Sequence, residues 1–442
     1  MQPSSFPEAV GTPAVDALSP LASRSAPLDA GAATIERRQA WFAFAMTFAL
    51  MLFDYMDRQV IVSLFPYMKL EWRVSDAQLG ALVSVVSVTV ALAGIPIALL
   101  ADRSSRVKSI VVMATVWSLA TVGCAFTRSY RLLLSARAVV GLGEAGYGSV
   151  GAALIASLFP IHQRARMMST FFAASAIGSV LGVLIGGVIA ARFGWHAAFG
   201  VVGIPGVLLA LGYLKVRDYR TVALGAPPAV SAALSTLKFG VRSLLGSRTM
   251  VWVCIGDAAQ LIVVSALWAW LPSYLNRIHG TPGAQASVKA ALVVLCGALG
   301  SVVCGHIVDR AGSTRARNKL LSVALLCLFA LAVLVGTFLA HLPAPTEFAL
   351  IALGGFLATC TAGAISAVVI DVVHPGVRAT GASVLSLFRN LLGLAAGPLI
   401  AGALSDAYGL AVAMAATPLF GLLAAACFVI AARYYEAERR PT

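Results

Sequence analysis

The sequence predicts an all-α integral membrane protein, and three observations lead to this prediction. The chain of 442 residues is 60% hydrophobic and only 11% charged, whereas a soluble domain carries about 25% charged residues. Its mean hydropathy is +0.90. The apolar residues gather into long runs, each close to the roughly 20 residues that an α-helix needs to cross a membrane.

These apolar runs divide into twelve expected membrane spans. They occupy residues 39–66, 77–101, 107–127, 131–159, 167–190, 197–215, 249–273, 286–308, 320–340, 347–372, 380–404 and 410–432. The first run starts near Trp41, after a long polar stretch, so we expect no signal peptide. Residues 1–38 are rich in Ala, Ser and Pro and are expected to form a disordered cytoplasmic tail.

A glycine pattern indicates two copies of one six-helix unit. Gly178, Gly182, Gly187 and Gly194 return 215 residues later as Gly393, Gly397, Gly402 and Gly409. We therefore expect two pseudo-symmetric six-helix halves, residues 39–216 and 249–434, which is the plan of some secondary transporters. Residues 217–248 would form a cytoplasmic linker with a short surface helix around Ala232–Leu245, and residues 435–442 a second cytoplasmic tail.

The net charge of +14 suggests a nucleic-acid partner at first sight, but its distribution argues otherwise. On the twelve-span plan, the tails and loops on the side of the termini hold 22 Lys and Arg residues, and the opposite loops hold 6. Such an excess marks the cytoplasmic side of a membrane protein. We therefore expect both termini in the cytoplasm, a bacterial inner membrane and no nucleic-acid partner.

The fourth span carries two charges inside its apolar run, Arg137 and Glu144. Each charge costs about 2.5–3.5 kcal/mol at the centre of a membrane helix, so we expect both to face the protein interior and to have a function. With Gly141 they stand at i, i+4 and i+7, on one face of a helix. The alternative is that Arg137 and Glu144 form a fixed structural pair.

The first span adds Asp54, Asp57 and Arg58, which share a helix face. In the simplest interpretation Asp54 and Arg58 neutralise one another, but Asp57 still needs a partner from another helix. Arg137 and Glu144 are about 10.5 Å apart along the helix axis, which leaves room for Asp57 between them. We predict that Asp57, Arg137 and Glu144 couple transport to protons, with Asp57 or Glu144 binding the proton and Arg137 acting as the counter-charge.

The second and eighth spans end in the same pattern. Asp102-Arg103, with Arg106 close behind, recurs 207 residues later as Asp309-Arg310. An aspartate at the C-terminal end of a helix lies at the unfavourable end of the helix dipole and needs a compensating partner. We expect these residues to act as gates on the cytoplasmic side.

The second half carries polar groups of its own inside the spans. Asp257 and Gln260 stand at i and i+3 in the seventh span, and Arg389 and Asn390 lie within the eleventh. Arg389 is suited to bind a carboxylate or phosphate through two parallel hydrogen bonds, and the alternative is that it pairs with Asp257. Asp257 faces either the transport cavity or water at the cytoplasmic edge.

Other patterns point away from an enzyme. Residues Gly141–Gly146 spell GxGxxG, but they lie inside a membrane span, without the strand and the later acid that a dinucleotide site needs. The chain contains no Ser/His/Asp set, no HExxH and no P-loop. We therefore predict no enzymatic activity and no cofactor.

The cysteines and two tryptophans receive structural interpretations. The seven cysteines all fall in expected spans and include no CxxC pair, so we expect packing residues and no metal site. Trp268 and Trp270 lie near the outer end of the seventh span and are expected in the aromatic belt at the membrane surface.

From about residue 39 to 432 the chain resembles the major facilitator superfamily. The motif GxxxDRxGR is recognisable at the ends of the second and eighth spans, with Ala98 and Ser105 replacing glycines in the first copy. The motif RxxxGxGEA matches Arg137–Ala145 in full. Within the superfamily the chain is most similar to the Spinster branch, through Tyr55–Arg58, Gly143–Tyr147 and Gln163–Ser169.

This resemblance implies the superfamily's fold of twelve transmembrane helices, and it supports the proton-coupling role of Asp57, Arg137 and Glu144. It also implies that Asp102 and Asp309 close the cytoplasmic side against helix N-termini of the other half, in the eleventh and the fifth span respectively. Spinster proteins resemble exporters of lysolipids and sphingoid phosphates, whereas the sequence around Arg389 resembles transporters of organic anions or drugs.

We predict a secondary active transporter that moves a small organic or amphipathic, anionic solute by alternating access, coupled to protons. The alternatives are a proton-linked lysolipid or multidrug exporter and, in another class, a receptor or sensor that does not transport. The expected partners are protons, the solute and membrane lipids, and we expect a monomer. The expected substrate contacts are Asp54, Arg58, Tyr147, Asp257, Gln260, Arg389 and Asn390.

Overall fold

The computed structural model describes residues 37–217, 247–340, 342–373 and 378–438. Within these ranges, twelve helical segments are long and apolar enough to cross a membrane, which confirms the predicted all-α fold. The predicted tail 1–38, apart from its last two residues, most of the linker 217–248 with its helix at Ala232–Leu245, and residues 439–442 of the second tail lie outside the described residues.

Each half builds six spans. The first half contains α1 (Arg37–Val60), η1 (Ile61–Ser63), α2 (Phe65–Trp72), α3 (Asp76–Arg103), α4 (Arg106–Cys124), α5 (Tyr130–Glu144), α6 (Tyr147–Leu158), α7 (Ile161–Phe193) and α8 (Trp195–Tyr213). The second contains α10 (Arg248–Arg277), α11 (Gly283–Gly312), α12 (Ala316–Leu339), α13 (Ala344–Ala358), α14 (Thr361–Val372), α15 (Arg378–Phe388), the π-helical segment η3 (Arg389–Leu394), α16 (Ala396–Tyr408), α17 (Leu410–Ala416), η4 (Thr417–Leu419) and α18 (Phe420–Glu438).

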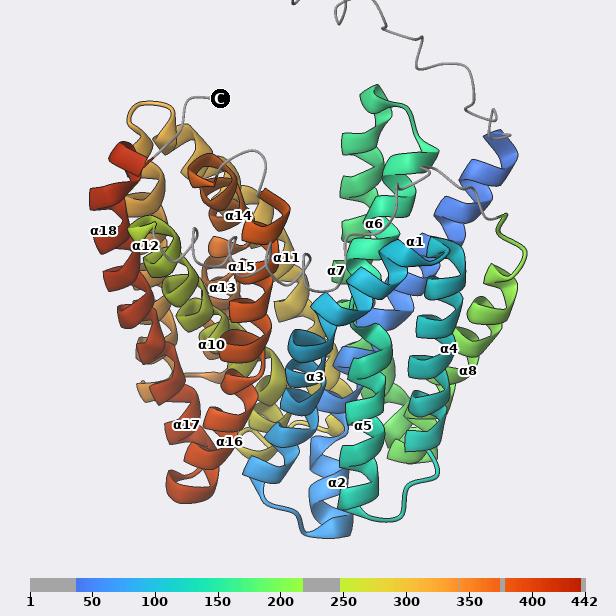
Figure 1. Cartoon of the computed structure of the whole chain (residues 1–442). Helices are drawn as coiled ribbons and strands as arrows, with labels where there is room; N and C mark the ends of the chain where they lie inside the picture. Colours follow the sequence, from blue (N-terminus) through green and yellow to red (C-terminus); the bar gives the residue numbers. More distant parts are fainter. Residues whose placement is uncertain (1–36, 218–246, 341, 374–377, 439–442) are drawn as a thin grey trace, which may run out of the picture.

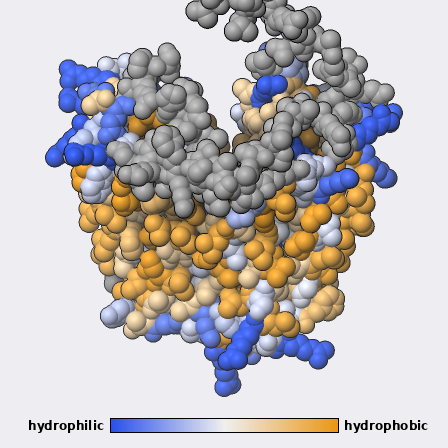
Figure 2. All heavy atoms as spheres, in the orientation of Figure 1, coloured by the Kyte–Doolittle hydropathy of each residue, from blue (hydrophilic) through white to orange (hydrophobic). Residues whose placement is uncertain are grey.

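The two halves form separate bundles, and the start of α1 and the end of α18 lie on one face, which we call the terminal face (Figure 1). The ribbons of the bundles lie apart towards this face and come together towards the opposite face (Figure 1). On the face that Figure 2 shows, hydrophobic residues form a broad belt across the middle of the molecule, with hydrophilic residues above and below it. This belt is what a membrane requires of a protein that crosses it.

The halves meet closely where glycine removes a side chain. A Cβ atom on Gly80 would overlap the backbone of Pro398, and one on Gly402 would overlap the backbone of Asp76. On a second helix pair, a Cβ on Gly187 would overlap the side chain of Ser287. The first two contacts lie at the start of α3 and the third near the start of α11, and small residues of this kind let membrane helices approach backbone to backbone.

The fourth span is broken. Its first helix, α5, ends at Glu144, and Gly146 adopts a left-handed conformation with φ 86° before α6 begins at Tyr147. Only glycine takes this conformation without strain, so the presence of glycine at position 146 allows the break between α5 and α6. Arg137, Gly141 and Glu144 therefore all lie on α5, with Glu144 at its last residue.

The predicted membrane-surface position of Trp270 is wrong. Its ring is fully buried, lies against Phe65 of the other half with ring centroids 5.1 Å apart, and donates a hydrogen bond of 3.0 Å to the carbonyl of Pro398. Trp268 is half-buried within its own half, close to Gly297. Hydropathy cannot separate a tryptophan at the membrane surface from one between two bundles, because both sites suit its apolar ring and polar N–H.

Candidate functional site

A buried ion pair joins α1 to α5. Arg137 Nη1 lies 3.3 Å from Asp57 Oδ1 and donates to the Asp57 carbonyl over 3.4 Å. Both side chains are at most 2% exposed. Thr121 of α4 donates a hydrogen bond of 2.7 Å to the other carboxylate oxygen, Oδ2. Three helices therefore fix this carboxylate, and each of its oxygens has a partner.

A second charged group lies beside the first on the same two helices. Arg58 Nε is 3.0 Å from Glu144 Oε2 and 3.5 Å from Asp54 Oδ1. The Arg58 side chain is 18% exposed, whereas that of Glu144 has no exposed surface. Neither Glu144 oxygen makes an aligned hydrogen bond within the described residues, so this is a contact of charges. The Arg58 guanidinium also lies 5.3 Å from the centre of the Tyr55 ring.

These contacts correct one expectation. Asp57 does not sit between Arg137 and Glu144, because Asp57 pairs with Arg137 while Glu144 pairs with Arg58. The physical reason is that adjacent residues of a helix point about 100° apart. Asp57 and Arg58 of α1 therefore point in different directions and contact different residues of α5. Asp54 and Arg58 do contact each other, as the simplest interpretation of the sequence expected, but Arg58 also contacts Glu144.

The second half holds a matching pair on α10 and η3. Arg389 Nε lies 2.5 Å from Asp257 Oδ2, and its terminal nitrogens donate to Ser366 Oγ and the Ala362 carbonyl, each over 3.2 Å. Asp257 is fully buried, so the alternative that it lies in water at the cytoplasmic edge is wrong. The alternative that Arg389 pairs with Asp257 is the one that the structure shows. Arg389 opens the π-helical segment, a distortion that is frequent at functional sites.

Three further predicted substrate contacts lie in different surroundings. Gln260 is buried and donates a hydrogen bond of 2.9 Å to the Ala358 carbonyl, and its side-chain oxygen has no partner within the described residues. Asn390 donates to the Ser386 carbonyl one turn back, over 2.9 Å. Tyr147 has no exposed surface and donates over 2.6 Å to the Thr47 carbonyl, which argues against a direct substrate contact in this conformation.

The predicted gate residues lie on the terminal face. Asp309 has a side chain that is 67% exposed and pairs with Lys319 of its own half at 3.5 Å. The contact expected between Asp309 and the fifth span is therefore not made in this conformation. Arg310 is exposed, and Arg106 donates to the Ala153 carbonyl over 3.4 Å. The side chains of Asp102 and Arg103 lie outside the described residues.

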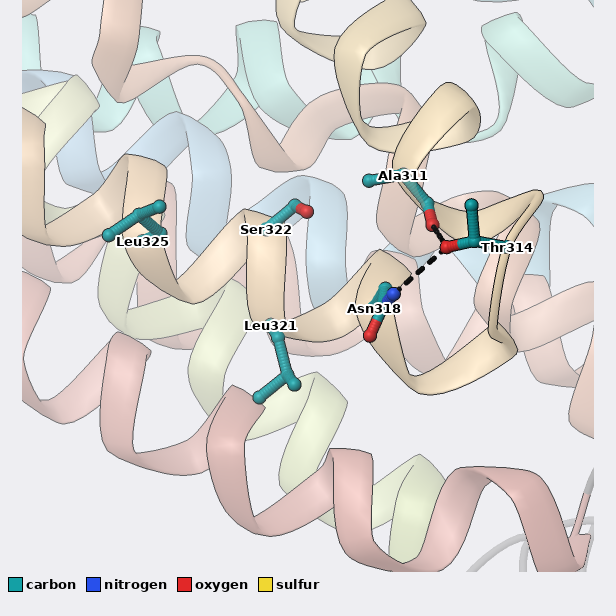
Figure 3. A pocket seen from close by; sticks show the side chains of 6 residues that line it. All are labelled: Ala311, Thr314, Asn318, Leu321, Ser322 and Leu325. Carbon is teal, nitrogen blue, oxygen red and sulfur yellow. Dashed lines mark hydrogen bonds between the residues drawn. The ribbon is translucent and has the colours of Figure 1, made fainter.

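A shallow groove opens beside this gate, where α11 turns into α12 (Figure 3). Asn318 donates a hydrogen bond of 3.0 Å to Thr314 at one end, and leucines line the other. The groove contains no ionisable side chain, and none of the charged pairs described above lines it. It is therefore a surface feature of the second half.

A charged group on the opposite face was missed by the sequence analysis. We call it the opposite-face cluster, and it consists of Lys69, Asp76, Arg277, Ser405 and Asp406. Asp76 lies 2.5 Å from Lys69, 2.8 Å from Arg277 and 2.5 Å from Ser405. The Asp406 carboxylate accepts two hydrogen bonds of 2.8 Å from the first backbone amides of α3. A signal was available, because Asp406 ends its span at the unfavourable end of the helix dipole.

The fold and these buried charges define a polytopic membrane transporter. A sequence model of the Major Facilitator Superfamily matches residues 47–395, and the chain belongs to this superfamily. It is 27% identical to Protein spinster homolog 3 of Danio rerio, with 92% of this chain and 88% of that protein covered. It is 29% identical to a probable L-galactonate transporter of Escherichia coli, with 62% of each chain covered.

A solved structure shares the arrangement of the helices. It is the crystal structure of a bacterial homologue of the human lysosomal transporter Spinster, in an inward-facing and unoccupied conformation. The TM-score is 0.83 at 24% identity, with 92% of this chain and all of that chain covered. The predicted resemblance to the major facilitator superfamily, and within it to the Spinster branch, is confirmed.

Proposed function

We propose that the chain is a proton-coupled secondary transporter of an organic anion. The proposal places both termini in the cytoplasm, so that the terminal face is cytoplasmic and the described conformation faces inward. The observation that carries the proposal is a set of three arginines inside the spans, two in the first half and one in the second, each in contact with a buried carboxylate. Charges at this depth are expensive unless they serve ion or substrate movement.

The proton step is proposed at the contact between Glu144 and Arg58. While Glu144 is ionised, it holds the Arg58 guanidinium. Protonation removes that negative charge and leaves Arg58 available to a substrate anion. Arg58 is more exposed than Arg137, the other paired arginine of the first half. Asp57 and Arg137 are nearly inaccessible, so we assign them to the mechanical part of the coupling, in which the pair sets the relative position of α1 and α5.

An anionic solute fits this arrangement because each half offers a guanidinium group. Arg58 and Arg389 both retain exposed surface, at 18% and 24% of their side chains. Guanidinium groups bind carboxylates and phosphates with directional, charge-assisted hydrogen bonds. The galactonate transporter among the relatives supports a sugar acid as the first substrate to test.

A lysophospholipid is the second candidate, because the resemblance to the Spinster branch implies it and because guanidinium groups also bind phosphates. Thermal unfolding of purified protein with L-galactonate, other sugar acids or lysophospholipids separates the two, because a bound ligand stabilises the folded state by mass action. Counterflow of the stabilising compound in proteoliposomes then distinguishes a transporter from a receptor that only binds.

The coupling is tested by flux into proteoliposomes with and without an imposed pH gradient, with L-galactonate as the first probe. Asp57→Asn and Glu144→Gln should each abolish gradient-driven accumulation, and Glu144→Gln should make exchange insensitive to pH. Glu436→Gln is the matched control, because it makes the same kind of change at an acidic residue near the end of α18, outside the coupling site. Wild-type accumulation in both site variants would contradict the proposed coupling, both the proton step at Glu144 and the mechanical role of Asp57.

A further inference from the structure

We infer that the opposite-face cluster is a latch that holds the two halves together on that face in this conformation and must open during transport. The inference rests on the alternating-access function proposed above. It concerns residues that lie outside the proton-coupling and substrate sites, and it assigns them the task of stabilising one of the two end states.

The first part of the latch is an ion pair between halves. Asp76 begins α3 in the first half, and Arg277 ends α10 in the second. Arg277 Nη1 lies 3.0 Å from one Asp76 oxygen and 2.8 Å from the other. The Asp76 side chain is only 3% exposed, so solvent screens this pair less than an ordinary surface pair. Ser405 of the second half adds a hydrogen bond to the same carboxylate.

The second part is a helix cap supplied by the other half. Asp406 stands near the C-terminal end of α16, where the partial charge of its own helix is also negative. Its carboxylate is instead bound by the amides of Asp76 and Ala77, at the positive start of α3. The capping box of Ser75 and Gln78 occupies the same helix start from within the first half. The backbone N–H groups in the first turn of α3 therefore find hydrogen-bond acceptors in both halves, Ser75 in the first and Asp406 in the second.

The backbones of α3 and α16 extend the latch towards the membrane interior. The two helices lie side by side (Figure 1), and the close approaches at Gly80 and Gly402 require them to be in contact. Ser84 donates a hydrogen bond across this junction to the Ala395 carbonyl. If the halves rock as rigid bodies, opening the opposite face breaks the Asp406 cap and these contacts together.

The same two spans carry the gate that the sequence predicts for the terminal face. There, Asp102 near the end of α3 is predicted to meet the start of the eleventh span, which begins with α15. The latch mirrors that arrangement, because Asp406 near the end of the eleventh span meets the start of α3. We infer that one carboxylate–helix-start contact closes each face, and that the two alternate.

The test measures the distance across the opposite face by electron–electron double resonance. Spin labels are placed at Arg128→Cys and Tyr408→Cys, two exposed positions in different halves, with the half-buried Cys296 replaced by serine. Asp406→Ala and Arg277→Gln should each add a population with a longer distance. We expect about a fivefold rise in the ratio of open to closed molecules, the size of effect that follows the loss of one helix cap.

Two controls sharpen the result. Asp406→Asn should stay close to wild type, because asparagine also caps helix starts. Glu71→Gln removes a negative charge from the same face, but Glu71 contacts Trp195 of its own half, so the distances should not change. Wild-type distance distributions in Asp406→Ala, in Arg277→Gln and in the double variant would overturn the latch.

The failure of the proposed transport function gives a different result. L-Galactonate and lysophospholipid flux is measured on the same variants without labels. A longer distance without any flux in the wild type would support the latch and contradict the transport proposal. Flux in the wild type with unchanged distances in all latch variants would support the transport proposal and contradict the latch.

Discussion

Replacing Asp57 by asparagine keeps the shape of the side chain and removes its negative charge. The change leaves Arg137, which is 1% exposed, without its carboxylate partner. Removal of one partner from a buried ion pair costs about 3–5 kcal/mol, because the remaining charge stays buried without compensation. Glu144→Gln is a different case, since Arg58 keeps Asp54 at 3.5 Å and retains contact with solvent.

The structure therefore predicts an asymmetry between two substitutions that look equivalent in sequence. At about 2.1 cal/mol/K of unfolding entropy per residue, a loss of 3–5 kcal/mol lowers the midpoint of thermal unfolding by about 3–5 °C in a chain of 442 residues. Glu144→Gln should lower stability clearly less than Asp57→Asn, because Arg58 keeps Asp54 and part of its side chain stays in contact with solvent. The assay is thermal unfolding of purified protein in one detergent at one pH.

A double-mutant cycle checks the cause. Arg137→Gln removes the stranded charge, so Asp57→Asn and Arg137→Gln together should destabilise the protein clearly less than the sum of the single variants, with a coupling of at least about 1 kcal/mol. Additive effects, or equal losses for Asp57→Asn and Glu144→Gln, would refute the assignment of Asp57 to Arg137 and of Glu144 to Arg58.

Three further predictions concern other parts of the chain. Arg389→Lys should weaken binding of the anionic probe by about tenfold, because lysine lacks the planar guanidinium that spans Asp257 and a ligand, and a titration of ligand-induced stabilisation measures this. Asp102→Asn and Asp309→Asn should change the rate of flux at unchanged expression, and unaltered rates in both would count against the gates. A reporter fused after residue 230 should report a cytoplasmic position, and a periplasmic signal there would overturn the proposed topology.

The twelve spans could be predicted because hydropathy and span length are properties of the sequence alone. The buried charges of the first half could also be found, since Arg137 and Glu144 are expensive in a membrane span unless they face the protein interior. The partner of Arg137 could be predicted as well, because a buried cation needs a nearby anion and Asp57 was the candidate. The partner of Glu144 could not. Whether Asp57 or Arg58 meets Glu144 depends on the rotation of α1 against α5, and the sequence pattern does not fix that rotation.

The opposite-face cluster shows a second limit of the sequence. Asp76 and Arg277 lie at span ends, where charges are common and cost little, so nothing in the local pattern separates a bridge between the halves from an ordinary surface charge. The dipole argument that singled out Asp102 applies equally to Asp406. What the sequence lacks is the information that the start of α3 lies against Asp406, which arises only when the two halves assemble.

The burial of Trp270 gives the protein an optical reporter of its own. Phe65, whose ring covers the indole, belongs to the first half, whereas the carbonyl that accepts the indole N–H belongs to the same half as Trp270. Separation of the halves on that face would take Phe65 away and bring water to the ring, which shifts indole fluorescence to longer wavelengths. Because the chain has seven tryptophans, Trp270→Phe identifies the contribution of this one, and unlabelled protein becomes sufficient to follow the conformational cycle in real time.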